Sequence, residues 1–162
     1  MRSKKIQSLN QLKKTVGALK KRGKKIGFTN GCFDLLHYGH IKYLKAAKMA
    51  CDVLIVAVNS DASISRIKGK NRPLTRLKQR IGILAELEPI DYLVSFGQAT
   101  PYRLIKTLKP DVLIKGADWK REDIVGKDIV ESYKGAVITV AYDKSFSTTR
   151  IIKEIAAKFK NK

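Results

Sequence analysis

The stretch DVLIVAVN, from Asp52 to Asn59, restricts the possible folds more than any other part of the chain. Its apolar residues are mostly β-branched and follow one another without the polar alternation of a half-exposed strand. Such a run is typical of a strand buried on both faces, as in parallel sheets that helices cover on each side. The rest of the chain is therefore expected to supply more strands, with helices between them.

Strand and helix patterns do alternate along the remaining sequence. Helices are predicted for residues 8–23, 38–50, 74–87, 100–109 and 147–160, and further strands for residues 24–30, 91–96, 111–115 and 135–142. At 162 residues the chain is long enough to bury a substantial core, and no linker or repeat divides it. We therefore predict one α/β domain, residues 1–162, whose leading helix (1–23) packs on a Rossmann-like open, mostly parallel sheet of about five strands with helices on both faces.

Several predicted helices begin or end at residues that favour helix termini. Ser8 is expected to cap the first helix, which ends at Gly23. Thr100 is the expected cap of the 100–109 helix, because Pro101 suits the first helical position. The segment from Ser60 to Pro73 is the longest stretch without a regular pattern, so it is predicted to be a loop.

The chain is strongly basic, with 34 Lys and Arg against 14 Asp and Glu and a formal net charge of +20. Three interpretations fit this excess: a nucleic-acid partner, a phosphate-rich small substrate, or a solvated basic surface. The basic residues are spread along the whole sequence, which favours the solvated surface. A nucleic-acid partner is therefore not expected.

No apolar run approaches the length of a membrane span, and no apolar segment follows the basic N-terminus. These features predict no membrane association and a cytoplasmic location. Cys32 and Cys51 form neither a CxxC pair nor a zinc-like spacing, so both are expected to be free thiols.

Both histidines of the chain lie in NGCFDLLHYGH, directly after the 24–30 strand. In parallel α/β sheets, ligands bind beyond the carboxyl ends of the strands, yet no GxGxxG or GxxxxGK[ST] loop is present to hold phosphates. His37 is expected just before a helix and His40 in its first turn, with Gly39 giving access to the backbone. Two imidazoles at a helix N-terminus form a clamp for a phosphate oxyanion. A metal site is not predicted, because the chain has no third histidine to complete one.

The HYGH sequence resembles the HxGH signature of the cytidylyltransferase-like nucleotidyltransferases, and further motifs follow in that family's order. They are Lys68 and Lys70 in IKGK, Arg80 in LKQRIGIL, the segment KGADW (115–119) and the segment SFSTTRII (145–152). Within the superfamily, the stretches FTNGCFDLLHYGHIKYL, LIVAVNSDASISRIKGKNRP and TPYRLIKTLKPDVLIKGADW resemble the heptose 1-phosphate adenylyltransferases. The resemblance covers nearly all of the chain.

This resemblance implies a reaction and a set of partners. AMP would move from ATP, with Mg²⁺, to D-glycero-β-D-manno-heptose 1-phosphate, giving pyrophosphate and ADP-heptose, a lipopolysaccharide precursor. The sugar kinase that often accompanies this domain is expected on a separate chain, because 162 residues cannot hold it. A homodimer is a further expectation, since relatives in the superfamily are often dimers.

The resemblance also implies roles for individual residues. The expected catalytic residues are His37, His40 and Lys68. The expected nucleotide-binding residues are Thr29, Asn30, Gly39, Arg80, Lys115, Gly116, Ser147, Thr148 and Thr149. The expected substrate-binding residues are Asp34, Lys70, Asp118 and Trp119. Each also has a purely structural interpretation, such as a surface salt bridge for Arg80 or a capped turn for Asp34.

Three alternatives stay open. Trp119 stands where heptose enzymes more often carry Tyr, which favours a CTP-dependent cytidylyltransferase acting on glycerol 3-phosphate or a similar alcohol phosphate. A class I aminoacyl-tRNA synthetase also uses an HxGH-type signature, but no KMSKS-like segment is present. A basic nucleic-acid-binding module predicts salt-dependent binding and no pyrophosphate release, and it leaves the histidine motif unexplained.

Overall fold

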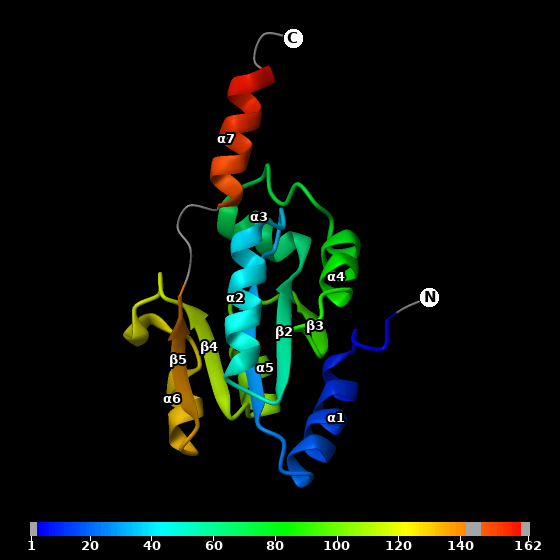
Figure 1. Cartoon of the computed structure of the whole chain (residues 1–162), viewed down its shortest axis with the longest axis vertical. Coiled ribbons are helices and arrows are strands. Elements are labelled where there is room, and N and C mark those ends of the chain that lie inside the picture. Colours follow the sequence, from blue (N-terminus) through cyan, green and yellow to red (C-terminus); the bar gives the residue numbers. More distant parts are fainter. Residues whose placement is uncertain (1–2, 142–146, 160–162) are drawn as a thin grey trace.

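Five parallel strands form the sheet of the computed structural model, which describes residues 3–141 and 147–159. The strands are β1 (Ile26–Gly31), β2 (Val53–Asn59), β3 (Tyr92–Phe96), β4 (Val112–Gly116) and β5 (Ala136–Val140). Their order across the sheet is β3-β2-β1-β4-β5, and every neighbouring pair is parallel (Figure 1). The predicted Rossmann-like α/β class is confirmed.

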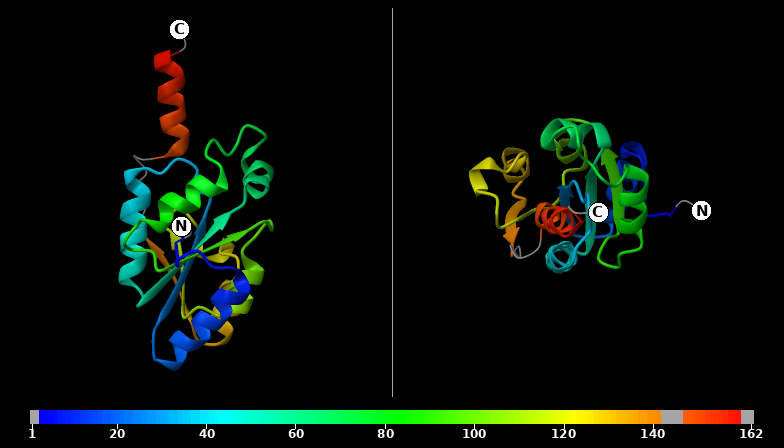
Figure 2. Two further views of the ribbon diagram at one scale, coloured as in Figure 1. Left: turned by 90° about the vertical axis from the view of Figure 1, so that its right-hand side faces the viewer. Right: turned by 90° about the horizontal axis from the view of Figure 1, so that it is seen from above.

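Helices cover both faces of this sheet. Within the described residues, the helices are α1 (Leu9–Lys21), α2 (Tyr38–Met49), α3 (Asp61–Lys68), α4 (Leu77–Ala85), α5 (Tyr102–Leu108), α6 (Lys127–Ser132) and α7 (Thr148–Phe159), with a short 3₁₀ turn at Arg121–Asp123. Apolar residues of α1, α5 and α6 pack in one core cluster, and those of α2 and α4 pack in a second. Figure 2 shows α1 and α2 on opposite sides of the sheet.

The DVLIVAVN run behaves as its composition predicts, because all seven residues of β2 are buried. Ile55 points into the cluster shared with α1 and α5, whereas Leu54 and Val56 point into the cluster shared with α2 and α4. Fully burying one such aliphatic side chain contributes about 1.5–3 kcal/mol. This strand therefore joins the two cores through the centre of the sheet.

Capping residues define the ends of α1 as predicted. Ser8 Oγ accepts a hydrogen bond from the Gln11 backbone N–H at 3.3 Å, and the Gln11 side chain accepts one in return from the Ser8 N–H. At the other end, Gly23 adopts a positive φ of 71°, which glycine tolerates at little cost. Leu12 and Val16 then anchor the helix in the core.

Two details of the predicted elements are wrong. The segment predicted as a loop (60–73) contains α3, which Ser60 caps by accepting from the Ser63 N–H at 3.2 Å. Its sequence shows little helical periodicity because only Ser63 and Ile64 are buried. The N-cap of α5 is Pro101 rather than Thr100, and no side chain caps that end.

The strand order creates a crevice at the carboxyl ends of β1 and β4. From β1 the chain moves outward through β2 to β3, and then returns to place β4 on the other side of β1. Ligands of open α/β sheets bind at such a reversal of strand order. Helix α7 rises beyond this end of the sheet, and its Thr148 Oγ1 donates to the Leu35 carbonyl at 3.3 Å (Figure 1). Among the described residues, no helix has both the length and the apolar character needed to cross a bilayer.

Candidate active site

The loop between β1 and α2 brings both histidines to the crevice. His37 is the N-cap of α2 and His40 lies in its first turn, as the sequence predicts. Phe33 in this loop has a φ of 48°, which is uncommon for a bulky residue and marks a constrained turn. Its ring packs so closely on Gly31 that a Cβ there would lie 2.9 Å from a ring carbon. The sharp turn is therefore held by packing.

The two imidazoles form a stacked pair. Their ring centres are 3.9 Å apart with an interplanar angle of 31°, and the centre of the Phe33 ring lies 5.4 Å from that of His40. The His37 backbone N–H points to His40 Nδ1 at 3.4 Å. Because Nδ1 is the acceptor, the proton of a neutral His40 belongs on Nε2, which can donate to a ligand oxygen.

Burial lowers the pKa of both histidines. For His40, burial with the nearby His37 and Lys68 lowers the pKa to about 4, and for His37 burial lowers the pKa from its ordinary value. Desolvation disfavours the charged imidazolium, which explains the direction of both shifts. The pair therefore offers neutral hydrogen-bond donors at pH 7.

A small pocket of about 140 Å³ opens beside His40. Six of the predicted site residues line it: Asn30, His40, Lys115, Gly116, Asp118 and Trp119. Gly31, Cys32, Phe33 and Tyr43 complete its wall. The crevice between β1 and β4 thus gathers residues that lie far apart in the sequence.

Lys115 is the buried cation of this pocket. Its ammonium group donates to Asn30 Oδ1 at 2.6 Å and lies 4.9 Å from the centre of the Trp119 ring. Burial lowers the pKa of Lys115 to about 8, while the nearby Asp118 and Cys32 act in the opposite direction. Lys115 therefore places a buried cation in this pocket, which the Asp118 carboxylate also lines.

Thr29 lies beneath the pocket, where its hydroxyl is fully buried. Thr29 Oγ1 and Tyr43 Oη are 2.6 Å apart, and Tyr43 Oη also donates to the Ile114 carbonyl at 3.3 Å. Burial raises the pKa of Tyr43 to about 12. The sequence analysis missed Tyr43, although its spacing of three from His40 places both on one helix face.

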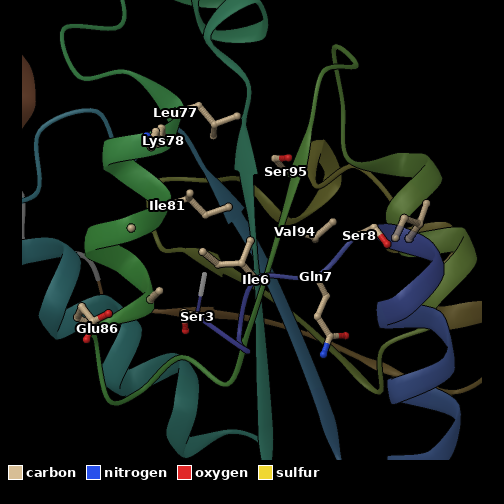
Figure 3. A pocket seen from close by; sticks show the side chains of 13 residues that line it. Ser3, Ile6, Gln7, Ser8, Leu77, Lys78, Ile81, Glu86, Val94 and Ser95 are labelled. Atoms are coloured by element: carbon tan, nitrogen blue, oxygen red, sulfur yellow. The ribbon is translucent and has the colours of Figure 1, made fainter. Parts of the chain in front are cut away.

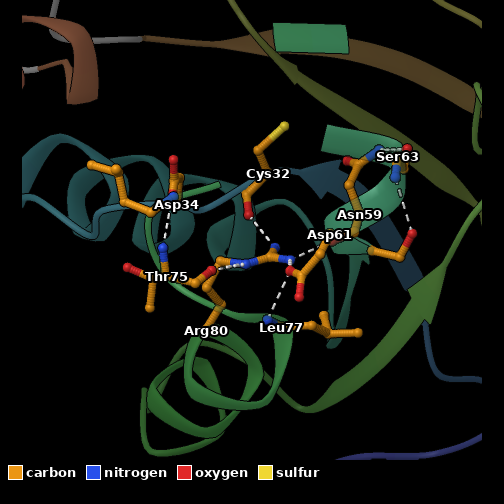
Figure 4. Close-up of polar contacts among 10 residues, drawn as sticks. Cys32, Asp34, Asn59, Asp61, Ser63, Thr75, Leu77 and Arg80 are labelled. Atoms are coloured by element: carbon orange, nitrogen blue, oxygen red, sulfur yellow. Dashed lines mark hydrogen bonds and ion pairs between the residues drawn. The ribbon is translucent and has the colours of Figure 1, made fainter. Parts of the chain in front are cut away.

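Arg80 is buried, at 1 % exposure, and its guanidinium contacts four protein acceptors (Figure 4). The acceptors are the carbonyls of Thr75 (2.9 Å), Cys32 (2.6 Å) and Asn59 (2.8 Å) and the carboxylate of Asp61 (2.8 Å). Nucleotide binding by Arg80 stays a prediction, but the contacts that the structure assigns to it are internal. They tie the ends of β1 and β2 to α4.

Asp34 anchors the segment that follows α3. Its carboxylate accepts from the backbone N–H groups of Leu74 (2.8 Å) and Thr75 (2.9 Å) and from Arg72 Nη1 (2.6 Å). Figure 4 shows the Thr75 contact beside the Arg80 cluster. The Asp34 carboxylate therefore caps this turn, in line with its structural interpretation. Arg72 is a partner of Asp34 that the sequence analysis missed.

The remaining predicted residues lie on α2, α3 and α7 or directly beside these helices. Lys68 ends α3 and is exposed, as is Lys70 beyond it, while Gly39 is buried in α2. At the start of α7, Ser147 Oγ accepts from the Arg150 N–H at 3.1 Å, so it caps the helix. Ser145 and Phe146 of the same motif lie outside the described residues.

A larger hollow of about 860 Å³ lies elsewhere, between α4 and residues 3–9 (Figure 3). About half of the residues that line it are apolar, including Ile6, Ile81 and Val94, and neither histidine is among them. The small charged pocket at the histidines, rather than this larger hollow, has the groups that phosphoryl chemistry requires.

Comparison with known proteins identifies the family. The cytidylyltransferase-like family matches residues 28–154. The chain belongs to the cytidylyltransferase-like family. The bifunctional protein HldE of Geobacter metallireducens is 56% identical over 151 residues, which are 93% of this chain and 31% of that protein. The chain thus spans about a third of the length of the curated relatives it matches.

Two solved structures share the fold of this cytidylyltransferase-like chain. A lipopolysaccharide core biosynthesis protein of Thermoplasma volcanium is 28% identical, with a TM-score of 0.61, and the match covers 75% of this chain and 98% of that one. The pantoate-β-alanine ligase of Francisella tularensis, 23% identical with a TM-score of 0.63 over 94% of this chain and 76% of that one, supports the fold alone. The predicted nucleotidyltransferase class is confirmed by the family match.

Proposed function

We propose that the protein transfers AMP from ATP to D-glycero-β-D-manno-heptose 1-phosphate, producing ADP-heptose and pyrophosphate. The observation that carries this proposal is the neutral His37–His40 pair at the N-terminus of α2, beside a pocket with a buried cation. The family match makes nucleotidyl transfer the reaction class, and the resemblance to heptose adenylyltransferases indicates the acceptor.

In this reaction a phosphate oxygen of the sugar 1-phosphate attacks the α-phosphorus of ATP. The new oxygen–phosphorus bond forms as the bond to the bridging oxygen of the β-phosphate breaks, and pyrophosphate leaves with that electron pair. The acceptor dianion has no proton to lose, so no general base is required. His37 and His40 are proposed to donate hydrogen bonds to the α-phosphate as its charge shifts.

Mg²⁺ is proposed to enter as part of the MgATP substrate. Within the described residues, no group of three or more His, Cys, Asp and Glu side chains could hold a metal ion. In the proposal, triphosphate oxygens and water supply most of the Mg²⁺ ligands. Lys68, Ser147 and Thr148, which border the histidine loop, are proposed to bind the leaving phosphates.

The proposed substrate also implies partners. A sugar 1-phosphate must come from a phosphorylating reaction, so a sugar kinase is the proposed functional partner. The homodimer and the single domain of residues 1–162 stay predictions.

Pyrophosphate release tests the proposal. Purified protein with Mg²⁺ is given ATP, CTP or GTP, each crossed with the heptose 1-phosphate and with glycerol 3-phosphate. We expect release only from ATP with the heptose phosphate, and a large loss in His40→Ala but not in the exposed control Lys158→Ala. Release only from CTP with glycerol 3-phosphate would contradict the proposed substrates and favour the Trp119 alternative. If the folded protein released no pyrophosphate in any combination, the proposed reaction would be rejected.

A further inference from the structure

Lys115 is a buried cation whose contacts with protein use only part of its hydrogen-bonding capacity. The residue is 5 % exposed, and within the part of the chain that the structure describes its ammonium group donates to a single acceptor, Asn30 Oδ1. No carboxylate of the described residues lies within ion-pair distance of it. An ammonium group has three N–H donors, so two remain for a ligand in the pocket. Because an unpaired buried cation is costly, an anionic ligand is expected to complete this site.

Other cations near the histidines are placed differently. In the described part of the chain, Arg80 contacts only internal acceptors, and Arg72, with a side chain 14% exposed, is paired with Asp34 at 2.6 Å. Lys68 is exposed at the end of α3. Among these cations, Lys115 alone is both buried and open to the pocket that His40 lines.

Lys68 and Lys115 approach the histidine loop from opposite sides. In the sheet, β1 lies between β2 and β4. Lys68 ends the helix that follows β2, whereas Lys115 lies in β4. Phosphoryl transfer keeps the attacking and leaving oxygens roughly in line through the reacting phosphorus. With the α-phosphate at the histidines and pyrophosphate leaving toward Lys68, the attacking phosphate approaches from the β4 side.

The geometry points to Lys115 as the residue that binds the phosphate group of the acceptor, with the Trp119 ring covering the ammonium group. The ligand class is a phosphate monoester dianion, and its identity as a sugar 1-phosphate rests on the proposed function. This assignment differs from the sequence-based prediction, which places Lys115 with the nucleotide.

Lys115→Met tests the assignment, because it removes the charge while keeping most of the side-chain volume. At saturating MgATP, we expect the KM for the heptose 1-phosphate to rise about ten- to hundredfold, as a charge-assisted contact is lost. Binding of α,β-methylene-ATP with Mg²⁺, measured by calorimetry, is expected to change less than twofold. Lys106→Met, at an exposed position of α5, is the matched control and is expected to change neither value.

A loss of α,β-methylene-ATP affinity as large as the loss for the acceptor would overturn the assignment, and so would an unchanged acceptor KM. If Lys115→Met does not fold, Lys115→Gln replaces it, because its amide can still donate to Asn30. The same two readouts then apply, with the same expected result.

A binding measurement separates this inference from the proposed function. Inorganic phosphate is titrated by calorimetry into the wild-type protein and Lys115→Met, each saturated with α,β-methylene-ATP and Mg²⁺. We expect at least tenfold weaker phosphate binding in the variant. If phosphate binding is weakened in this way but the wild type does not turn over the heptose phosphate, the proposed acceptor is rejected and the role of Lys115 is kept. Equal affinity in both proteins, or no binding in either, would overturn the role of Lys115.

Discussion

Arg80 offers a direct test of whether a cation predicted to bind phosphate instead holds the fold together. Replacing it with Met keeps an unbranched apolar side chain but removes all four hydrogen bonds of the guanidinium. Three backbone carbonyls then lose their donor. They belong to Cys32 after β1, Asn59 at the end of β2, and Thr75 between α3 and α4. Asp61 keeps one partner, because its Oδ1 also accepts from the Leu77 N–H at 2.9 Å.

The expected loss follows from the burial of these groups. Removing one partner of a buried ion pair costs about 3–5 kcal/mol. The lower end applies here, since the Asp61 side chain is 29% exposed and water can replace part of its contact. We therefore expect Arg80→Met to lose about 3 kcal/mol of unfolding free energy, or about 6–12 °C in Tm for a chain of this size. Urea denaturation and calorimetry measure both quantities.

Two further variants sharpen the result. Arg80→Lys keeps the charge but not the planar fork, so we expect it to recover less than half of the lost stability. Arg103→Met, at an exposed position of α5, is the control and is expected to keep the wild-type Tm. An Arg80→Met protein with wild-type Tm and lost α,β-methylene-ATP binding would refute this reasoning and support the sequence-based role in phosphate binding.

Three other predictions concern separate parts of the molecule. Because the pKa of His40 is about 4 when folded and near 6.5 when unfolded, the unfolded chain binds the extra proton between these values, so the unfolding free energy should fall as pH drops from about 6.5 toward 4. Asp34→Asn should weaken the contact with Arg72 and speed hydrogen exchange in residues 72–75. Gly27→Ala should destabilise the protein by about 1–3 kcal/mol, because the added Cβ would lie 2.5 Å from Cys51 Sγ.

Each of these predictions has a clear contrary result. A His40→Gln variant that keeps the wild-type slope of stability against pH would exclude His40 as the source of that slope. Unchanged exchange rates in Asp34→Asn would show that the side-chain oxygen that Asn retains, which can still accept from the Leu74 and Thr75 N–H groups, is enough to hold the segment. A Gly27→Ala protein as stable as the wild type would mean that Cys51 moves aside at no cost, and a Gly27→Ala, Cys51→Ala pair tests this.

Local pattern in the sequence determined the elements that frame the site. The apolar run 52–59 became the central strand, Ser8 became a helix cap, and His37 and His40 lie at the N-terminus of α2. These features depend on residues within a few positions of one another, so periodicity and capping chemistry are enough to predict them. The short helix α3 was not predicted, because only Ser63 and Ile64 of it are buried and its sequence shows little helical periodicity.

Only the tertiary structure decided which groups the site side chains contact. The bonds from Arg80 to the Cys32 carbonyl, from Arg72 to Asp34 and from Lys115 to Asn30 join residues 48, 38 and 85 positions apart. Such partners meet because the strand order sets β2 and β4 on either side of β1, and no local pattern encodes that adjacency. The sequence therefore indicated that Arg80 and Lys115 are functional cations. Burial and strand order decided that the Arg80 guanidinium contacts protein acceptors, whereas Lys115 lines the pocket.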